Sequence, residues 1–113
     1  MKSILLATLI TGLLSFQCNK AEYDAPSCIE AKIARLKAES KANPPAQVDE
    51  YIYNGKKVYL FNAPCCDQYS ELYDESCNLL CAPYGGISGH GDGKCADFSA
   101  NAQHVRVIWK DSR

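Results

Sequence analysis

The chain has 113 residues, enough for one small domain, and its formal net charge is −1 at neutral pH. It contains no run of like charge and no basic patch, which argues against a nucleic-acid partner because binding to phosphates needs clustered lysines and arginines. Its unusual feature is its seven cysteines, five of which lie between positions 65 and 95.

The first 17 residues have the pattern of a secretion signal. A positive start precedes an apolar run over residues 4–14, which is shorter than the roughly 20 apolar residues of a membrane span. Cys18 follows, where a bacterial lipoprotein carries its lipid-modified cysteine, although Gln17 stands where a small residue is usual. We expect a signal peptide over residues 1–17 and a lipid-anchored tether over residues 18–26. The alternative is a plain secreted chain in which Cys18 is removed or left free.

The cysteines beyond Cys18 predict a disulfide framework. An exported chain meets an oxidising compartment, where thiols form disulfides in preference to holding zinc. If Cys18 is acylated, an even number remains and all can pair, in an order that the sequence leaves open. Adjacent side chains of an extended segment point to opposite faces, so we expect Cys65 and Cys66 to bond different partners. The predicted framework consists of Cys28, Cys65, Cys66, Cys77, Cys81 and Cys95.

A single helix is predicted at the start of the domain. Ser27 and Glu30 have the spacing of a capping box, and Ile29, Ile33 and Leu36 form an apolar stripe with helical periodicity. The helix is therefore expected over residues 28–41, ending before two prolines. Cys28 in its first turn is expected to pin the helix to the sheet.

Strands are predicted for most of the remaining chain. Residues 48–53 and 57–62 flank Asn54-Gly55, a strong hairpin signal because both turn residues take positive φ. A second hairpin is expected from residues 71–74 and 78–82, with a helical turn over residues 67–72 as the alternative.

The chain ends in a short turn or helix over residues 96–102 and a strand over residues 104–109. Val105, Val107 and Trp109 share one face of that strand and are expected to face the core. The fold class is thus α+β: residues 27–113 form one disulfide-stapled domain, with an N-terminal helix packed on an antiparallel sheet of four to five strands.

Candidate binding residues lie in the first hairpin and in a glycine-rich loop. Tyr51 and Tyr53 share one face of their strand, while Tyr59 lies on the next strand. Cross-strand packing explains such tyrosines most simply, and an exposed binding surface is the alternative. His90 in the loop is the fourth candidate.

The glycine-rich loop covers residues 83–94 and lacks the spacing of a phosphate-binding loop. Asp92 and Asp97 could supply oxygen ligands to calcium, although two carboxylates are few. The simpler interpretation is an irregular loop whose glycines supply positive φ and whose ends are joined through Cys81 and Cys95. No pattern marks a catalytic nucleophile, so we expect no enzyme and no cofactor.

Several stretches resemble a known family. They read CCDQYSELYDESCNLLCAP, GGISGHGDGKCADF and VIWKDSR, with PSCIEAKI, NPPAQV and YNGKKVY before them. They are similar to the recurring features of a small uncharacterised family of bacterial exported proteins and lipoproteins, across nearly all of residues 26–113. The resemblance implies one exported domain stapled by the six cysteines and names no catalytic residue.

These observations predict a non-enzymatic binding or structural module of the cell envelope. A lipid would hold it at a membrane, and its partner would be a protein or a glycan. One alternative is an inhibitor of a secreted hydrolase that presents residues 83–94. The other is a calcium-dependent module or enzyme that uses the loop over residues 85–94.

Overall fold

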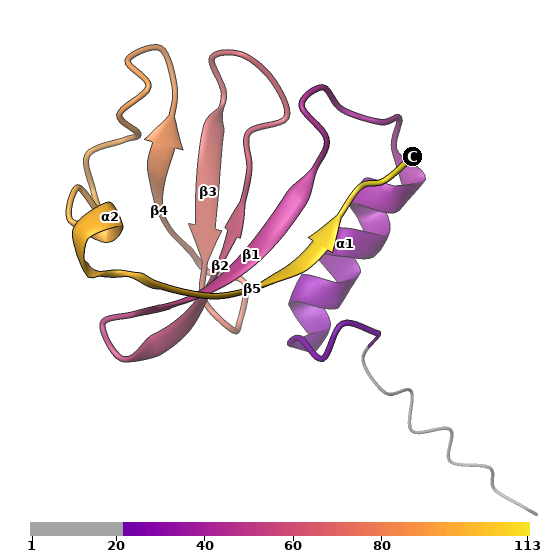
Figure 1. The fold of residues 1–113 in the computed structure, drawn as a ribbon, viewed down its shortest axis with the longest axis horizontal. Helices are drawn as coiled ribbons and strands as arrows, with labels where there is room; N and C mark the ends of the chain where they lie inside the picture. Colours follow the sequence, from indigo (N-terminus) through magenta and orange to yellow (C-terminus); the bar gives the residue numbers. More distant parts are fainter. Residues whose placement is uncertain (1–21) are drawn as a thin grey trace, which may run out of the picture.

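The computed structural model describes residues 22–113, and the predicted signal peptide and Cys18 lie outside them (Figure 1). The described elements are α1 (Ser27–Ala38), β1 (Gln47–Tyr53), β2 (Lys56–Phe61), β3 (Tyr69–Tyr73), β4 (Leu79–Gly85), α2 (Phe98–Asn101) and β5 (Gln103–Lys110). The strands form one antiparallel sheet in the order β4-β3-β2-β1-β5. The predicted fold class, an N-terminal helix on a small antiparallel sheet, is confirmed.

Both predicted hairpins are present. Asn54 and Gly55 have φ of 52° and 75°, and Tyr53 pairs with Lys56 across the turn that they form. β3 and β4 form the second hairpin, so the alternative of a helical turn over residues 67–72 is wrong.

The start of α1 differs from the capping box that the sequence predicts. Pro26 precedes the helix, and no side chain caps its first turn. The Glu30 carboxylate instead accepts a hydrogen bond of 2.7 Å from the Tyr23 amide. Glu30 therefore holds the segment before the helix, while the unpaired amides of the first turn receive no side-chain cap.

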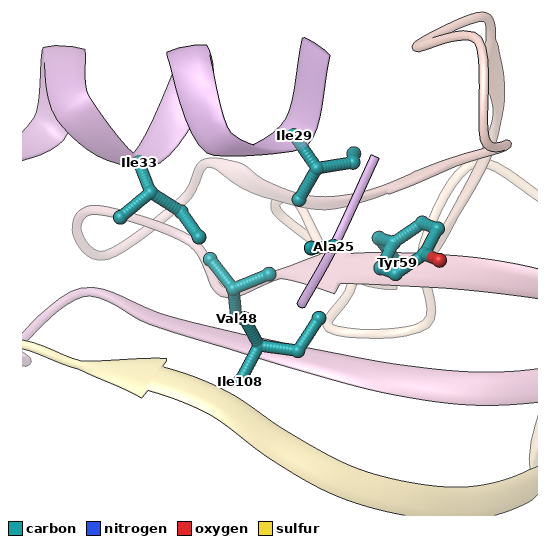
Figure 2. Close-up of a cluster of buried hydrophobic side chains, with 6 residues drawn as sticks. All are labelled: Ala25, Ile29, Ile33, Val48, Tyr59 and Ile108. Carbon is teal, nitrogen blue, oxygen red and sulfur yellow. The ribbon is translucent and has the colours of Figure 1, made fainter. Parts of the chain in front are cut away.

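The sheet has an apolar core on each face. We call the side that packs against α1 the helix face and the opposite side the loop face. Figure 2 shows the helix-face core, where Ile29 and Ile33 of α1 point toward Val48 and Ile108 on the strands. The loop-face core is formed by Val58, Leu60, Leu72, Cys81, Cys95 and Phe98. On β2, Tyr59 belongs to the helix-face core and Val58 and Leu60 to the loop-face core, so side chains alternate between the faces.

β5 presents a different side chain to the core than the sequence predicts. Val105 and Val107 are 48% and 49% exposed, whereas Ile108 is buried. The pairing of β5 with β1 shifts register at two points, which interrupts strict alternation along the strand. The prediction that Val105 and Val107 face the core is therefore wrong, and Trp109 alone of the three packs against the helix-face core.

Three disulfides cross-link the described residues. Cys28–Cys77 joins α1 to the β3–β4 turn, and Cys81–Cys95 closes the glycine-rich loop, as expected. The third joins the adjacent Cys65 and Cys66, so the prediction that they bond different partners is wrong. Cys66 has φ of 52°, so the segment is not extended there and its side chains do not alternate.

Two arginines fasten α1 at its two ends. Before the helix, Arg106 donates to the carbonyls of Tyr23 and Asp24 at 2.8 Å and pairs with the buried Glu50 carboxylate. After it, Arg113 donates to the carbonyls of Leu36, Lys37 and Glu39. The Lys37 carbonyl is one that a helix C-terminus leaves without an intrahelical partner, and the Glu39 carbonyl directly follows the helix.

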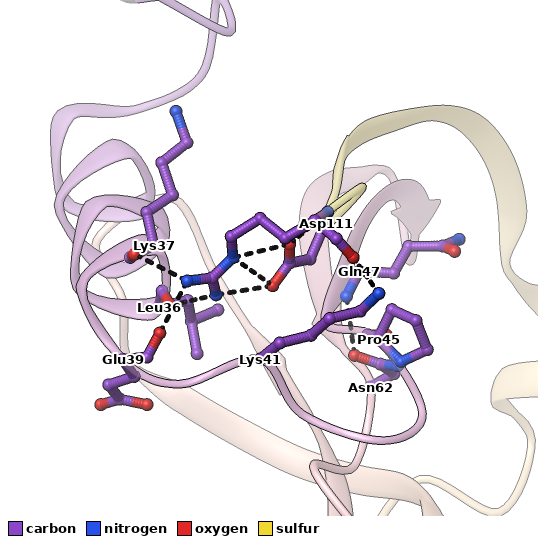
Figure 3. A network of polar contacts seen from close by, with 9 residues as sticks. Leu36, Lys37, Glu39, Lys41, Pro45, Gln47, Asn62 and Asp111 are labelled. Carbon is purple, nitrogen blue, oxygen red and sulfur yellow. Dashed lines mark hydrogen bonds and ion pairs between the residues drawn. The ribbon is translucent and has the colours of Figure 1, made fainter.

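The contact at the C-terminal end of α1 belongs to a larger polar network, shown in Figure 3. Asp111 pairs with Arg113 at 2.7 Å, and its own amide donates to the Ala46 carbonyl. Hydrogen bonding to Arg113 lowers the pKa of Asp111 to about 2. The Lys41 ammonium donates to the Arg113 carbonyl, which fixes the loop after the helix to the end of the chain.

Candidate functional site

A groove of about 250 Å³ lies beside α1 on the helix face. α1 packs over β1, β2 and β5, and its second half borders part of β2 and β3 that it leaves uncovered. We call this the α1–β3 groove. Its distinctive side chains are Lys32 and Arg35 from α1, Glu39 just after it, Phe61 from β2, and Tyr69, Glu71 and Tyr73 from β3.

One wall of the groove is aromatic. Phe61 and Tyr73 meet edge to face with ring centroids 5.4 Å apart, and Tyr69 is 47% exposed. The Lys32 ammonium lies 4.1 Å from the centroid of the Tyr73 ring, a cation–π contact. Burial, followed by the nearby Glu71 carboxylate, raises the pKa of Tyr73. Its phenol therefore stays neutral at physiological pH and can donate a hydrogen bond.

The charged side chains of the groove balance one another. Lys32 and Arg35 are cations, and Glu39 and Glu71 are anions. Asp111 also reaches the groove, but its charge is paired with Arg113. The groove therefore offers hydrogen-bond donors and acceptors without a net charge that would select a strongly ionic ligand.

Sequence reasoning missed Tyr69 and Tyr73, which supply two of the three rings. A signal was present, because Tyr69, Glu71 and Tyr73 alternate with Ser70 and Leu72 in a short strand. The alternation stands inside the cysteine-rich stretch. The sequence does not show which face of the sheet α1 covers. The alternation alone therefore does not tell which of the two sets of β3 side chains borders the helix.

The predicted tyrosine surface is mostly internal packing. Tyr51 and Tyr53 lie on the loop face, with ring centroids 5.0 and 5.3 Å from that of Phe98. Tyr59 is only 1% exposed, so its place at an exposed binding surface is a wrong prediction. Burial, together with the Glu50 carboxylate, raises the pKa of Tyr59 to about 12. Internal packing accounts for these three residues, but it is cross-strand packing only in part, because Phe98 belongs to α2 and Tyr59 packs beneath α1.

Asp92 and Asp97, the predicted calcium ligands, accept hydrogen bonds from different parts of the protein. Asp92 accepts from the amides of Ala82 and Lys94 at 3.1 and 3.0 Å. Asp97 accepts from the Tyr53 hydroxyl, which is the main reason why the pKa of Asp97 is lowered. Within residues 22–113, no three His, Cys, Asp or Glu side chains gather as they would around a metal ion.

The glycine-rich loop is held tightly against β4. Asp92 bonds Ala82 through both its carboxylate and its amide, and Gly91 donates to the Gly85 carbonyl. Gly91 has φ of 76°, and a Cβ there would collide with the Ala82 carbonyl oxygen. At the outer part of the loop His90 is exposed and Ile87 is 93% exposed. A fixed loop thus presents an apolar side chain to solvent.

The protein is therefore a small α+β domain with three disulfides and a surface groove. The chain belongs to the family described as a domain of unknown function (DUF6970), which matches residues 34–111. This confirms the resemblance to an uncharacterised family, and the match spans all five strands and most of the groove. No curated protein and no solved structure matches the chain.

The disulfides also bear on location. Cross-links of this kind form in oxidising compartments, so they suggest an extracytoplasmic protein. Among the described residues, no helix combines the length and apolarity that a membrane crossing requires.

Proposed function

We propose that this protein is an exported, non-enzymatic binding module that holds one saccharide unit of a glycan in the α1–β3 groove. The observation that carries the proposal is the groove itself. Three aromatic rings stand beside two cations and two carboxylates, in addition to the Asp111 that is paired with Arg113, in a space of about 250 Å³. In the same proposal the lipid on Cys18 holds the domain at the cell envelope.

The chemistry of a sugar ring fits this lining. A pyranose has apolar C–H faces that lie against aromatic rings, and hydroxyls at its edge that need both donors and acceptors. Tyr69 and Tyr73 offer the rings, Arg35 donates, and Glu71 accepts. Drug-sized ligands occupy pockets of about 300 Å³ or more, so the groove has room for one ring rather than a long chain segment.

Ligand-observed NMR with a panel of neutral and N-acetylated monosaccharides and short glycans tests the proposal. We expect saturation transfer from the protein to at least one sugar, and its loss in Tyr69→Ala. Tyr84→Ala is the matched control, because Tyr84 is 39% exposed and contacts Phe98 on the loop face. No transfer to any sugar, or equal transfer with Tyr69→Ala, would contradict the proposal.

A second function, inhibition of a secreted hydrolase, is favoured by one observation. Ile87 is 93% exposed on a loop whose conformation is fixed by Asp92 and by the Cys81–Cys95 disulfide. A rigid loop loses little conformational entropy when it enters an active site. Assays of proteases and glycan hydrolases with excess protein should show inhibition that Ile87→Asp removes and Val107→Asp retains. If no enzyme of the panel is inhibited, this function loses its support.

A further inference from the structure

We propose that Cys65–Cys66 is a thiol–disulfide exchange site, which a dithiol reductant opens while the buried Cys81–Cys95 disulfide stays closed. The site goes beyond the proposed binding function and does not depend on it. It lies in the connection between β2 and β3, and Cys66 is exposed.

Accessibility separates this disulfide from the loop-face disulfide. Cys81 and Cys95 are only 3% and 5% exposed and belong to the loop-face core. Exchange begins when a thiolate attacks a disulfide sulfur, so its rate depends on access to that sulfur. An incoming thiolate can approach Cys66 at the surface, whereas Cys81–Cys95 must first be uncovered by local unfolding.

Position in the chain separates it from both of the others. Cys28–Cys77 and Cys81–Cys95 have sequence separations of 49 and 14, whereas Cys65 and Cys66 are neighbours. The restriction that a disulfide places on the unfolded chain grows with the number of residues it encloses. The adjacent pair encloses none, so stabilisation of the fold does not account for it.

The surrounding backbone is held by contacts that do not involve sulfur. The Gln68 amide donates to the Cys65 carbonyl at 3.0 Å. The Ala63 amide donates to the Ser70 hydroxyl oxygen at 2.9 Å. These bonds span the connection from both sides, so opening the disulfide leaves β2 and β3 in place.

The reaction is a complete two-electron exchange. One thiolate of the reductant attacks the sulfur of Cys66 and forms a mixed disulfide, while Cys65 leaves as a thiolate and takes up a proton. The second thiol of the reductant loses its proton and attacks the mixed disulfide. This step releases Cys66, which is protonated in turn. The protein gains two electrons and two protons, and the reductant becomes a disulfide.

Timed reduction of the folded protein with dithiothreitol tests the site. Samples are quenched with iodoacetamide, and the labelled cysteines are identified by peptide mass spectrometry. We expect Cys65 and Cys66 to be labelled about tenfold faster or more than Cys81 and Cys95, because the exposed disulfide opens without uncovering the loop-face core. Near-UV circular dichroism should stay native through this fast phase.

Two variants and one blank make the test decisive. Cys65→Ser/Cys66→Ser should lose the fast phase, and Cys81→Ser/Cys95→Ser should retain it. Labelling of Cys65 or Cys66 without reductant would show that the bond is absent and overturn the proposal. Reduction of all three disulfides in a single phase would overturn it as well.

Discussion

The helix face and the loop face belong to the same sheet and are closed in different ways. On the helix face, a twelve-residue helix places Ile29 and Ile33 over β1, β2 and β5. On the loop face, a four-residue helix contributes one large ring, Phe98, and an irregular loop completes the cover. Two aromatic side chains of β1 meet Phe98, which makes it the centre of that core.

The difference shows what each kind of cover needs. A helix repeats its apolar positions, so it brings a continuous stripe to the sheet, and its straight course leaves the α1–β3 groove beside it. A loop has no such repeat. Its cover depends on one anchor residue, on the Cys81–Cys95 cross-link and on glycines with positive φ. Removing single elements from each face tests this contrast.

The largest effect is expected from Phe98→Ala. Removal of a buried phenylalanine lowers the free energy of unfolding by about 3–5 kcal/mol, and Ile33→Ala on the helix face by about 2–5 kcal/mol. Hydrogen exchange should separate the two variants. Phe98→Ala should raise exchange in residues 86–97 while α1 stays protected, and Ile33→Ala should do the reverse. Equal loss of protection everywhere would mean that the faces unfold as one unit.

Each disulfide should stabilise the fold more when it encloses more residues of the chain. Loop-closure entropy predicts a loss of about 4 kcal/mol for Cys28→Ser/Cys77→Ser and about 3 kcal/mol for Cys81→Ser/Cys95→Ser. Cys65→Ser/Cys66→Ser should cost the least, because the adjacent pair encloses no residues. Urea denaturation of the three double variants measures this order, and a reversed order would refute the entropic explanation.

Two glycines of the loop form a matched pair with a smaller expected effect. Gly89 and Gly91 both have φ of 76°, but a Cβ at Gly89 meets nothing within 4 Å. Gly89→Ala should therefore cost only the left-handed backbone penalty of about 1–2 kcal/mol. Gly91→Ala adds the collision with residues 82 and 83, roughly 1–3 kcal/mol more. Equal melting temperatures for the two variants would show that the loop can move away from the added methyl group at little cost.

The smallest effect concerns the end of α1 and depends on pH. The pKa of Asp111 is lowered from 3.8 to about 2, so the folded state favours its ionised form. Its contribution to stability is complete above about pH 4 and is lost as the pH falls toward 2. Asp111→Asn should melt at a lower temperature than the wild type at pH 6. By pH 2 the difference between the two melting temperatures should be smaller. Asp67→Asn, at an exposed position, is the control.

Local signals account for the part of the fold that the sequence predicted. The Asn54-Gly55 turn and the apolar stripe of α1 each depend on a few neighbouring residues. The Cys81–Cys95 bond joins the ends of the glycine-rich loop as the sequence suggested, whereas the partner of Cys28 was left open by the sequence.

The remainder depends on contacts between distant segments. Alternation along β5 groups Val105, Val107 and Trp109 on one face and leaves Ile108 among polar residues, so only the register shifts against β1 decide that Ile108 is buried. The burial of Tyr59 depends on which side α1 covers. The pairing of Cys65 with Cys66 depends on the positive φ of Cys66, which the sequence does not signal because the residue is not a glycine. The α1–β3 groove exists only once the helix is placed on the sheet, so its residues carry no common motif.

The Cys28–Cys77 disulfide also determines how the domain bears mechanical load. A force applied between residue 22 and the C-terminus reaches Cys28 after a few residues and crosses to Cys77 through a covalent bond. The Cys81–Cys95 bond shortens the path in the same way, so β1, β2, β3 and the glycine-rich loop lie outside the stretched segment. Of the described residues, only 22–28, 77–81 and 95–113 can extend while both bonds are intact, so the two disulfides limit how far the domain can be stretched.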